Sequence, residues 1–231
     1  MLLSEWEPVY EDLLNDMGFD RSSDESSARL LKAMTQNSNI VPEEVLSDLV
    51  KMNAIVVGGN VSENDTAKIK GLVNTEKGIE GRDTVLISAG SATGALMMNK
   101  IVPDIVVTDL DGDIELQKKA SDAGSLMMIH AHGDNADLIM EHIKDITGKI
   151  MITTQSVPDA VLCNFGGFTD GDRAVCTARH FGAKRITLIG FDLDAPAFKE
   201  GTDMAVKKKK LAWAKKIIFD MNPSGVMITP L

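Results

Sequence analysis

The feature that most constrains this 231-residue chain is a series of short apolar segments, each ending in small or polar residues and most followed by helix-like spacing. Uninterrupted apolar segments of strand length that alternate with helices predict a parallel sheet covered by helices on both faces. We therefore expect residues 49–231 to form an α/β, Rossmann-like domain with a mostly parallel sheet. The apolar segments occupy residues 53–60, 83–90, 104–113, 125–135, 149–155, 185–192 and 225–230.

The first 48 residues follow a different pattern. Residues 6–19 and 22–34 have the apolar spacing of amphipathic helices, and Ser23 or Asp24 would cap the second helix. We expect residues 1–48 to form a helical region that packs on the main domain or on a partner subunit. A homo-oligomer is one arrangement that this packing allows.

Charge and composition exclude several classes of partner. The chain has 24 Lys and Arg against 34 Asp and Glu, a net charge of −10, whereas binding to nucleic acid normally requires surplus cations. No apolar segment approaches the roughly 18–20 residues of a membrane span, and residues 1–9 lack the features of a signal peptide. The two cysteines, Cys163 and Cys176, are too few for a disulfide framework. We expect a soluble, cytoplasmic protein that binds neither nucleic acid nor membranes.

Six of these segments end in small or polar residues, directly after the predicted strand. In an open parallel sheet the carboxyl ends of the strands line the ligand crevice. Solvated loops would be richer in Lys, Glu and Pro, whereas these groups are small, acidic or amide residues. We therefore predict a ligand site at this edge, formed by residues 58–60, 88–91, 109–111, 130–135, 153–155 and Asp192.

One of these groups places Asp109, Asp111 and Asp113 immediately after an apolar strand. An EF-hand calcium loop starting at Asp109 is excluded, because Ile114 stands where Gly is needed and Ala120 where Glu is needed. Mg²⁺ typically takes one or two carboxylates and bridges to substrate phosphates. The motif therefore predicts a magnesium site for a phosphorylated ligand, and Mg²⁺ would supply the positive charge that this acidic chain lacks.

The same DxDG sequence also resembles the nucleophile motif of haloacid-dehalogenase-type phosphatases, whose first Asp is phosphorylated. In that family Thr or Val usually follows the Gly, and the motif usually ends the first strand of the domain. Here Asp113 follows the Gly and at least two strands precede the motif. These two departures count against the resemblance. A phosphate-ester hydrolase with Asp109 as nucleophile nevertheless stays open as an alternative function.

Groups that could bind phosphate lie along the same edge, although the chain has no P-loop sequence. Residues 58–60 and 88–94 offer backbone N–H groups at strand ends, and either could equally be a plain turn. Residues 130–135 contain two histidines but lack a fourth ligand for zinc, so we interpret them as polar site residues. Arg173 fits a phosphate clamp. The helix expected to begin at Lys207 presents lysines either to solvent or to the phosphates.

Taken in order, these motifs resemble the archaeal-type 6-hydroxymethyl-7,8-dihydropterin pyrophosphokinases, the MptE family. The resemblance rests on VPDIVVTDLDGD, HAHGDN, TTQ, NFGGFTDGDRAV and the late K-L-x-x-A of Lys210, Leu211 and Ala214. The opening WEPVYEDLLNDMGFDRSSDESSA is also similar, so the resemblance covers nearly the full chain. A more distant similarity is to thiamine pyrophosphokinases, which carry an acidic magnesium motif. One departure is Gly90, which stands where the family's usual ADGA has Asp.

The resemblance implies transfer of the β,γ-diphosphate of ATP, as a unit, to the hydroxymethyl group of a reduced pterin, with release of AMP, in folate or methanopterin biosynthesis. Such a reaction depends mostly on positioning and charge neutralisation. Two other functions stay open. One is a sugar-nucleotide-binding, glycosyltransferase-like protein, because the superfamily includes such motility-accessory proteins. The other is a binding module without turnover, which the Gly90 departure suggests.

The resemblance, together with position at strand ends, assigns roles to individual residues. The expected magnesium site consists of Asp109, Asp111 and Asp113. Asp109 and Asp111 would hold the ion, and Asp113 and Asp104 would complete the outer shell. The expected catalytic residues are Asp109, Asp111, Arg173 and Asp192, the last to deprotonate or orient the hydroxyl. The expected nucleotide-binding residues are Gly58, Gly59, Asn60, Ser91, Asp134, Asn135, Gln155 and Lys210. The expected pterin-binding residues are Asn164, Phe165, Phe168, Asp170 and Asp172, although either Phe fits the core equally well and Asp172 also fits a helix cap.

Overall fold

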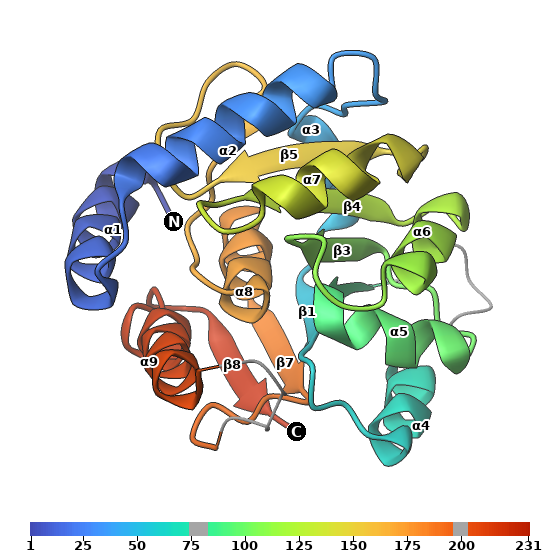
Figure 1. The fold of residues 1–231 in the computed structure, drawn as a ribbon. Coiled ribbons are helices and arrows are strands. Elements are labelled where there is room, and N and C mark those ends of the chain that lie inside the picture. Colours follow the sequence, from blue (N-terminus) through green and yellow to red (C-terminus); the bar gives the residue numbers. More distant parts are fainter. Residues whose placement is uncertain (74–82, 196–202) are drawn as a thin grey trace.

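A computed structural model of the chain describes residues 1–73, 83–195 and 203–231. Its centre is an eight-stranded sheet in the order β6-β5-β4-β3-β2-β1-β7-β8, in which every pair of neighbouring strands is parallel (Figure 1). The predicted α/β, Rossmann-like class is confirmed. The strands are β1 (Asn53–Val57), β2 (Thr84–Ala89), β3 (Ile105–Thr108), β4 (Leu126–Ala131), β5 (Ile150–Thr154), β6 (Leu162–Cys163), β7 (Arg185–Ile189) and β8 (Met227–Pro230).

Helices cover both faces of the sheet, which explains why consecutive residues of the central strands β3, β4 and β5 are buried, rather than alternate ones. One face packs against α3 (Glu44–Leu49), α8 (Asp170–His180) and the π-helical segment η3 (Lys216–Asp220). The other face packs against α2, α4, α5, α6 and α7. These five helices are α2 (Arg21–Met34), α4 (Glu63–Leu72), α5 (Gly90–Met98), α6 (Ile114–Asp122) and α7 (Ala136–His142), the last of which continues into the 3-10 segment η2 (Ile143–Asp145).

The N-terminal helices pack tightly on the sheet domain. In α2, Leu31 packs with Met127 and Ile129 of the sheet. In α1 (Leu3–Met17), Trp6 and Tyr10 are fully buried in a separate cluster with residues of α8 and η3. Figure 1 shows α1 beside α9 (Met204–Lys215), which begins three residues before the predicted start at Lys207.

The cap predicted for α2 is wrong. Asp20 caps this helix, because its carboxylate accepts a hydrogen bond from the Ser22 N–H at 3.1 Å. Asp24 instead lies inside the first turn, 4% exposed, and its carboxylate faces the interior. The chain thus places two aspartates four residues apart, and only the first one satisfies the free N–H groups at the helix start.

The order of the strands in the sheet reverses at β1. From β1 the chain runs strand by strand to β6 on one side, and it then returns to place β7 on the other side of β1. Ligand crevices of open α/β sheets lie at the carboxyl ends of the strands beside such a reversal. Among the described residues, no helix is both long and apolar enough to cross a membrane.

Candidate active site

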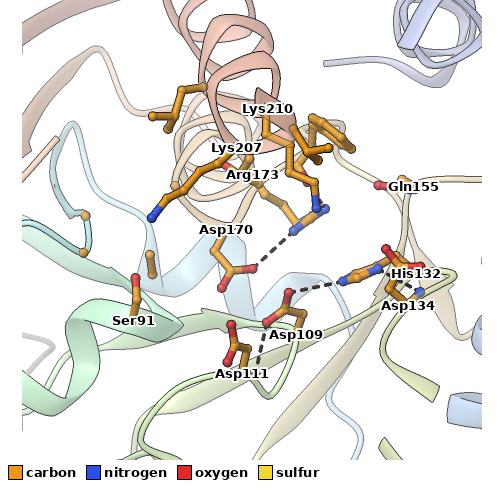
Figure 2. Close-up of a pocket in the computed structure, with 18 of the residues that line it drawn as sticks. Ser91, Asp109, Asp111, His132, Asp134, Gln155, Asp170, Arg173, Lys207 and Lys210 are labelled. Atoms are coloured by element: carbon orange, nitrogen blue, oxygen red, sulfur yellow. Dashed lines mark hydrogen bonds and ion pairs between the residues drawn. The ribbon is translucent and has the colours of Figure 1, made fainter. Parts of the chain in front are cut away.

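A cavity of about 850 Å³ lies along the carboxyl edge of the sheet. Turns that follow β1, β3, β4, β5 and β7 line it, together with the starts of α5 and α8. Two further walls come from the α1–α2 connection and from α9 (Figure 2). The sequence predicted the strand-end turns, the start of α8 and Lys210 of α9, but not the wall formed by the α1–α2 connection and the start of α2.

The acidic centre of the cavity follows β3. Asp109 accepts a hydrogen bond from the Asp111 N–H at 3.1 Å and pairs with His132 Nε2 at 3.2 Å. Leu110 between the two aspartates has φ +69°, a conformation that is rare for a residue with a side chain. Burial opposes ionisation of Asp109, but His132, the Asp111 N–H and the charge of Arg173 outweigh it and bring the pKa of Asp109 to about 2. Asp109 is therefore an anion at neutral pH.

A second carboxyl, Asp170, faces this centre from the start of α8. Arg173 reaches it at 3.3 Å and also donates to the backbone oxygen of Phe168 at 3.1 Å. Burial and the charge of Asp109 raise the pKa of Asp170 well above its usual value, although Arg173 opposes the shift. Two carboxyls that disfavour each other's ionisation are stabilised by a bound cation or by a shared proton. Figure 2 shows Asp170 and Arg173 directly across from Asp109.

The structure shows why Gly90 matters at this place. A Cβ atom on Gly90 would lie 2.6 Å from Thr108 Oγ1 and 3.1 Å from Asp170 Oδ2. No side chain fits there without displacing Asp170 or β3. The side chains of Thr108 and Asp170 together occupy the space into which a side chain at position 90 would point.

Small residues form one end of the cavity, here called the glycine end: Gly58, Gly59, Asn60, Ser91 and Gly190. A Cβ on Gly58 would lie 2.7 Å from the Gly190 oxygen, and a Cβ on Gly59 would lie 2.6 Å from Ser91 Oγ. The glycines thus allow the turns after β1 and β7 to approach each other closely. Asp192 also lines this end, and its Oδ1 accepts N–H groups of residues 194 and 195.

The opposite end of the cavity, here called the aromatic end, is lined by Phe19, Asp24, Gln155 and Phe168. The rings of Phe19 and Phe168 lie 6.3 Å apart, and the Lys210 ammonium lies 5.7 Å from the centre of each ring. Asp134 also lines the cavity at this end, in the turn that follows β4. Phe19 and Asp24 were missed because the first 48 residues were interpreted as packing helices. Gly18, which ends α1 in the left-handed backbone conformation, was the local signal of a turn there.

Thirteen of the predicted site residues line one cavity: Gly58, Gly59, Asn60, Ser91, Asp109, Asp111, Asp134, Gln155, Phe168, Asp170, Arg173, Asp192 and Lys210. Five do not. Asp113 caps α6 by accepting the Leu116 N–H at 3.1 Å, and Asn135 holds the turn after β4 by donating to the backbone oxygens of Asp109 and His130. Both support the acidic centre from outside the cavity.

The other three predicted residues outside the cavity lie before or within α8. Phe165 packs in the core against Phe181, with ring centres 5.0 Å apart. Asn164 donates to the Ser156 oxygen at 2.6 Å, and Asp172 accepts the Phe168 and Thr169 N–H groups at the helix start. Asp172 thus closes a capping box, as one of its two interpretations proposed.

Asp104 lies far from the outer shell that the sequence suggested. It precedes β3, whereas Asp109 follows it, so the two carboxylates stand at opposite edges of the sheet. Asp104 is 3% exposed and accepts the Leu86 N–H at 2.8 Å, which joins the start of β3 to β2.

The donor groups at the acidic centre fit a hard cation such as Mg²⁺. Within the described residues, no three or more His, Cys, Asp or Glu side chains are grouped to hold a metal ion by themselves. Mg²⁺ needs fewer, because it usually keeps water and takes substrate phosphate oxygens beside one or two carboxylates. Asp109 and Asp111 offer such a pair, and the mutual repulsion of Asp109 and Asp170 would be relieved by a cation.

Fold and cavity together define an α/β protein of the doubly wound class, with a ligand site in which carboxylates face Arg and Lys side chains. A family model described as 6-hydroxymethylpterin diphosphokinase MptE-like matches residues 28–197. The chain belongs to this family.

Three curated proteins from archaea, each named 6-hydroxymethyl-7,8-dihydropterin pyrophosphokinase, are similar to the chain over nearly its full length. The protein from Methanocaldococcus jannaschii is 32% identical, covering 94% of this chain and 95% of its own length. The protein from Pyrococcus furiosus is 35% identical, with 97% and 96% covered. The protein from Methanothermobacter thermautotrophicus is also 35% identical, with 95% of each chain covered. These alignments extend well beyond the range of the family model, so they include parts of the chain outside residues 28–197.

Proposed function

We propose that this chain transfers the β,γ-diphosphate of ATP to the hydroxymethyl group of 6-hydroxymethyl-7,8-dihydropterin, in a step of folate or methanopterin biosynthesis. The products are AMP and the pterin diphosphate. The observation that carries the proposal is the near full-length similarity to three pyrophosphokinases of this name. The cavity supports it, because carboxylates at its centre are flanked by cations and by two chemically different ends.

In this proposal the diphosphate lies over the acidic centre. A bond forms between the pterin hydroxyl oxygen and the β-phosphorus, and the bond from the β-phosphorus to the α-bridging oxygen breaks. Mg²⁺ held by Asp109 and Asp111 would neutralise charge on the phosphate oxygens. Arg173, 4% exposed and fixed by Asp170 and the Phe168 oxygen, is pre-positioned to bind an equatorial oxygen.

The hydroxyl proton must also be removed. Asp170 lies at the centre, across from Asp109 and Asp111, which hold Mg²⁺ in this proposal, so its carboxylate is available to receive the proton. Asp192, predicted for this role, lies after β7 at the glycine end. We therefore propose Asp170 as the group that receives the proton.

The test is ³¹P NMR of the purified protein with ATP, Mg²⁺ and 6-hydroxymethyl-7,8-dihydropterin, beside the variant Asp111→Asn. We expect AMP and a new pterin diphosphate from the wild type, and a rate lower by about a hundredfold or more in the variant. Asp122→Asn, an exposed residue at the far end of α6, is the matched control and should keep the wild-type rate.

Three other results would each contradict a part of the proposal. Free phosphate instead of AMP would show a hydrolase and contradict the proposal. ATP binding without turnover would show a nucleotide-binding module. Equal rates with Mg²⁺ and with excess chelator would contradict the metal role of Asp109 and Asp111, although not the transfer itself.

A further inference from the structure

The two ends of the cavity offer ligands different chemistry. The glycine end presents backbone and small polar groups beside β1 and β7, where the order of the strands reverses. Nucleotides usually bind at such a reversal. The aromatic end lies beyond Asp109 on the other side, at β4 and β5, and presents ring faces with a carboxylate and an amide. The transfer point lies between the two ends, so each end can hold one of the two substrates.

Asp24 organises the aromatic end. Its buried carboxylate accepts three hydrogen bonds: from Tyr10 Oη at 2.6 Å, from the Gly133 N–H at 2.7 Å and from Gln155 Nε2 at 2.7 Å. A carboxylate can only accept, so the Gln155 amide must turn its nitrogen to Asp24 and its oxygen away. A carboxylate has about four acceptor positions, and one remains on Asp24. The Gln155 side chain also contacts His130, and both Asp24 and Gln155 line the cavity, so the end brings a carboxylate and a carboxamide to a ligand.

The acceptor oxygens of a carboxylate and a carboxamide would distinguish the two heterocycles. The amino-pyrimidinone edge of a pterin presents two neighbouring donors, the ring N3–H and the 2-amino group. The corresponding edge of adenine presents one donor and one acceptor, and its acceptor would face a carboxylate or amide oxygen without a proton between them. An unpaired polar group of this kind costs about 1–3 kcal/mol when buried. The aromatic end therefore matches the pterin better than it matches adenine.

The aromatic rings provide the matching apolar surface. Phe19 is partly exposed at the rim of the cavity, and Phe168, 8% exposed, lies beneath it. A flat bicyclic ring gains stability by covering such faces, beyond the area that it buries. Lys210 reaches over both rings, at a position between the aromatic end and the cavity centre where the diphosphate would lie.

On this basis, and resting on the proposed function, we infer that the aromatic end is the subsite of the pterin ring. Asp24 and Gln155 recognise the amino-pyrimidinone edge, and Phe19 and Phe168 cover the ring. Gln155, which was expected from the sequence to bind the nucleotide, then binds the acceptor substrate instead. Substrate recognition then directly involves α2, which carries Asp24, and the α1–α2 connection, which carries Phe19. ATP then occupies the glycine end.

Equilibrium binding of two probes tests this assignment. The probes are 6-hydroxymethylpterin, which has the same amino-pyrimidinone edge and is fluorescent, and α,β-methylene-ATP, whose α–β linkage cannot be cleaved. Gln155→Met keeps the side-chain length and loses the acceptor. We expect it to raise the Kd of the pterin about tenfold and to leave the Kd of the ATP analogue within about twofold.

A second variant guards against misfolding of Gln155→Met. Phe19→Ala removes a ring at the rim, and we expect it to weaken the pterin alone, whereas Phe19→Tyr keeps the ring and should restore binding. Asn60→Ala at the glycine end is the reciprocal variant and should weaken the ATP analogue alone. If Gln155→Met or Phe19→Ala weakens the ATP analogue instead of the pterin, or both ligands equally, the assignment is wrong.

The failure of this inference can be separated from the failure of the proposed function. A wild type that forms no pterin diphosphate contradicts the proposed function, whatever the variants bind. A wild type that forms it, combined with the wrong binding pattern in the variants, contradicts only the assignment of the two ends.

Discussion

The glycine end and the aromatic end belong to one cavity but are built in different ways. The glycine end is made by turns that directly follow β1 and β7 and the start of α5, where missing side chains let backbone segments approach. The aromatic end joins residues far apart in the chain, since Asp24 bonds to Gln155 across 131 positions. Backbone fit defines the first end, and side-chain hydrogen bonds define the second.

This difference matters for what each end can recognise. Backbone N–H groups at strand ends and helix starts suit phosphate and are tolerant of the rest of the ligand. A buried carboxylate with fixed partners discriminates between donor and acceptor edges, because a mismatch leaves a buried group unpaired. We therefore expect specificity for the acceptor substrate to reside in the aromatic end.

The largest expected effect comes from adding one methyl group beside the aromatic end, and it can be compared with the same addition at the glycine end. A Cβ on Gly133 would lie 2.9 Å from Ser23 Cβ and 3.4 Å from Asp24 Oδ1, so the start of α2 must move. We expect Gly133→Ala to lower the free energy of unfolding by about 1–3 kcal/mol, as overpacking does, and to weaken the pterin. Denaturant unfolding and pterin fluorescence measure the two effects.

The matched change at the glycine end is Gly59→Ala. Its Cβ would meet chiefly Ser91 Oγ, which can rotate away, so the stability loss should be smaller. Binding of the ATP analogue should weaken while the pterin is unaffected. If the two alanine variants lost the same stability and affected both ligands alike, the two ends would not be separate units.

Much of the fold could be predicted from the sequence. Seven strands were visible, because each has at least four apolar or small residues in a row between helical segments. The eighth strand, β6, was not, because its two residues are too few to show a pattern. Its place in the sheet depends on pairing with β5, which is tertiary information.

How far the site residues could be predicted from the sequence also differs between the two ends. Residues at the glycine end follow strands directly, so their position could be inferred from the order of the elements. Phe165 and Phe168 could not be told apart, since Gly166 and Gly167, both at positive φ, turn the chain between them. No periodicity carries through such a turn, and one ring enters the core while the other lines the cavity. Asp24 was interpreted as a cap because its partners lie elsewhere in the chain.

Two neighbouring lysines of α9, Lys207 and Lys208, differ in whether they line the cavity. Lys207 lines the cavity, and Figure 2 shows it pointing toward the side where Ser91 lies. We expect Lys207→Ala to raise the Kd of α,β-methylene-ATP about tenfold at low salt, and less at high salt, where the charge of this partly exposed side chain is screened. Titration calorimetry at two ionic strengths measures this.

Lys208→Ala is the control, because Lys208 is exposed on the same helix and lies outside the cavity lining. It should change neither Kd. A Lys207→Ala variant that weakened the pterin and not the ATP analogue would reverse the assignment of the two ends.

The smallest effect is expected at Tyr10, the only tyrosine of the chain, whose hydroxyl donates to Asp24. Burial and the neighbouring Asp24 raise the pKa of Tyr10, so the folded protein keeps the proton where an unfolded tyrosine, with a pKa of about 10, loses it. This contribution to stability is complete below about pH 10 and is lost as the pH rises further.

Tyr10→Phe keeps the ring and removes the hydrogen bond. We expect it to lower the free energy of unfolding by about 1 kcal/mol at neutral pH and to weaken the pterin slightly, with no effect on the ATP analogue. The difference from wild type should shrink above about pH 10, because only the wild type has a tyrosine to ionise on unfolding. Tyrosinate absorbance in the wild type follows this one residue. A titration with an ordinary tyrosine pKa in the folded protein would show that the Tyr10–Asp24 contact does not hold α1 to the aromatic end.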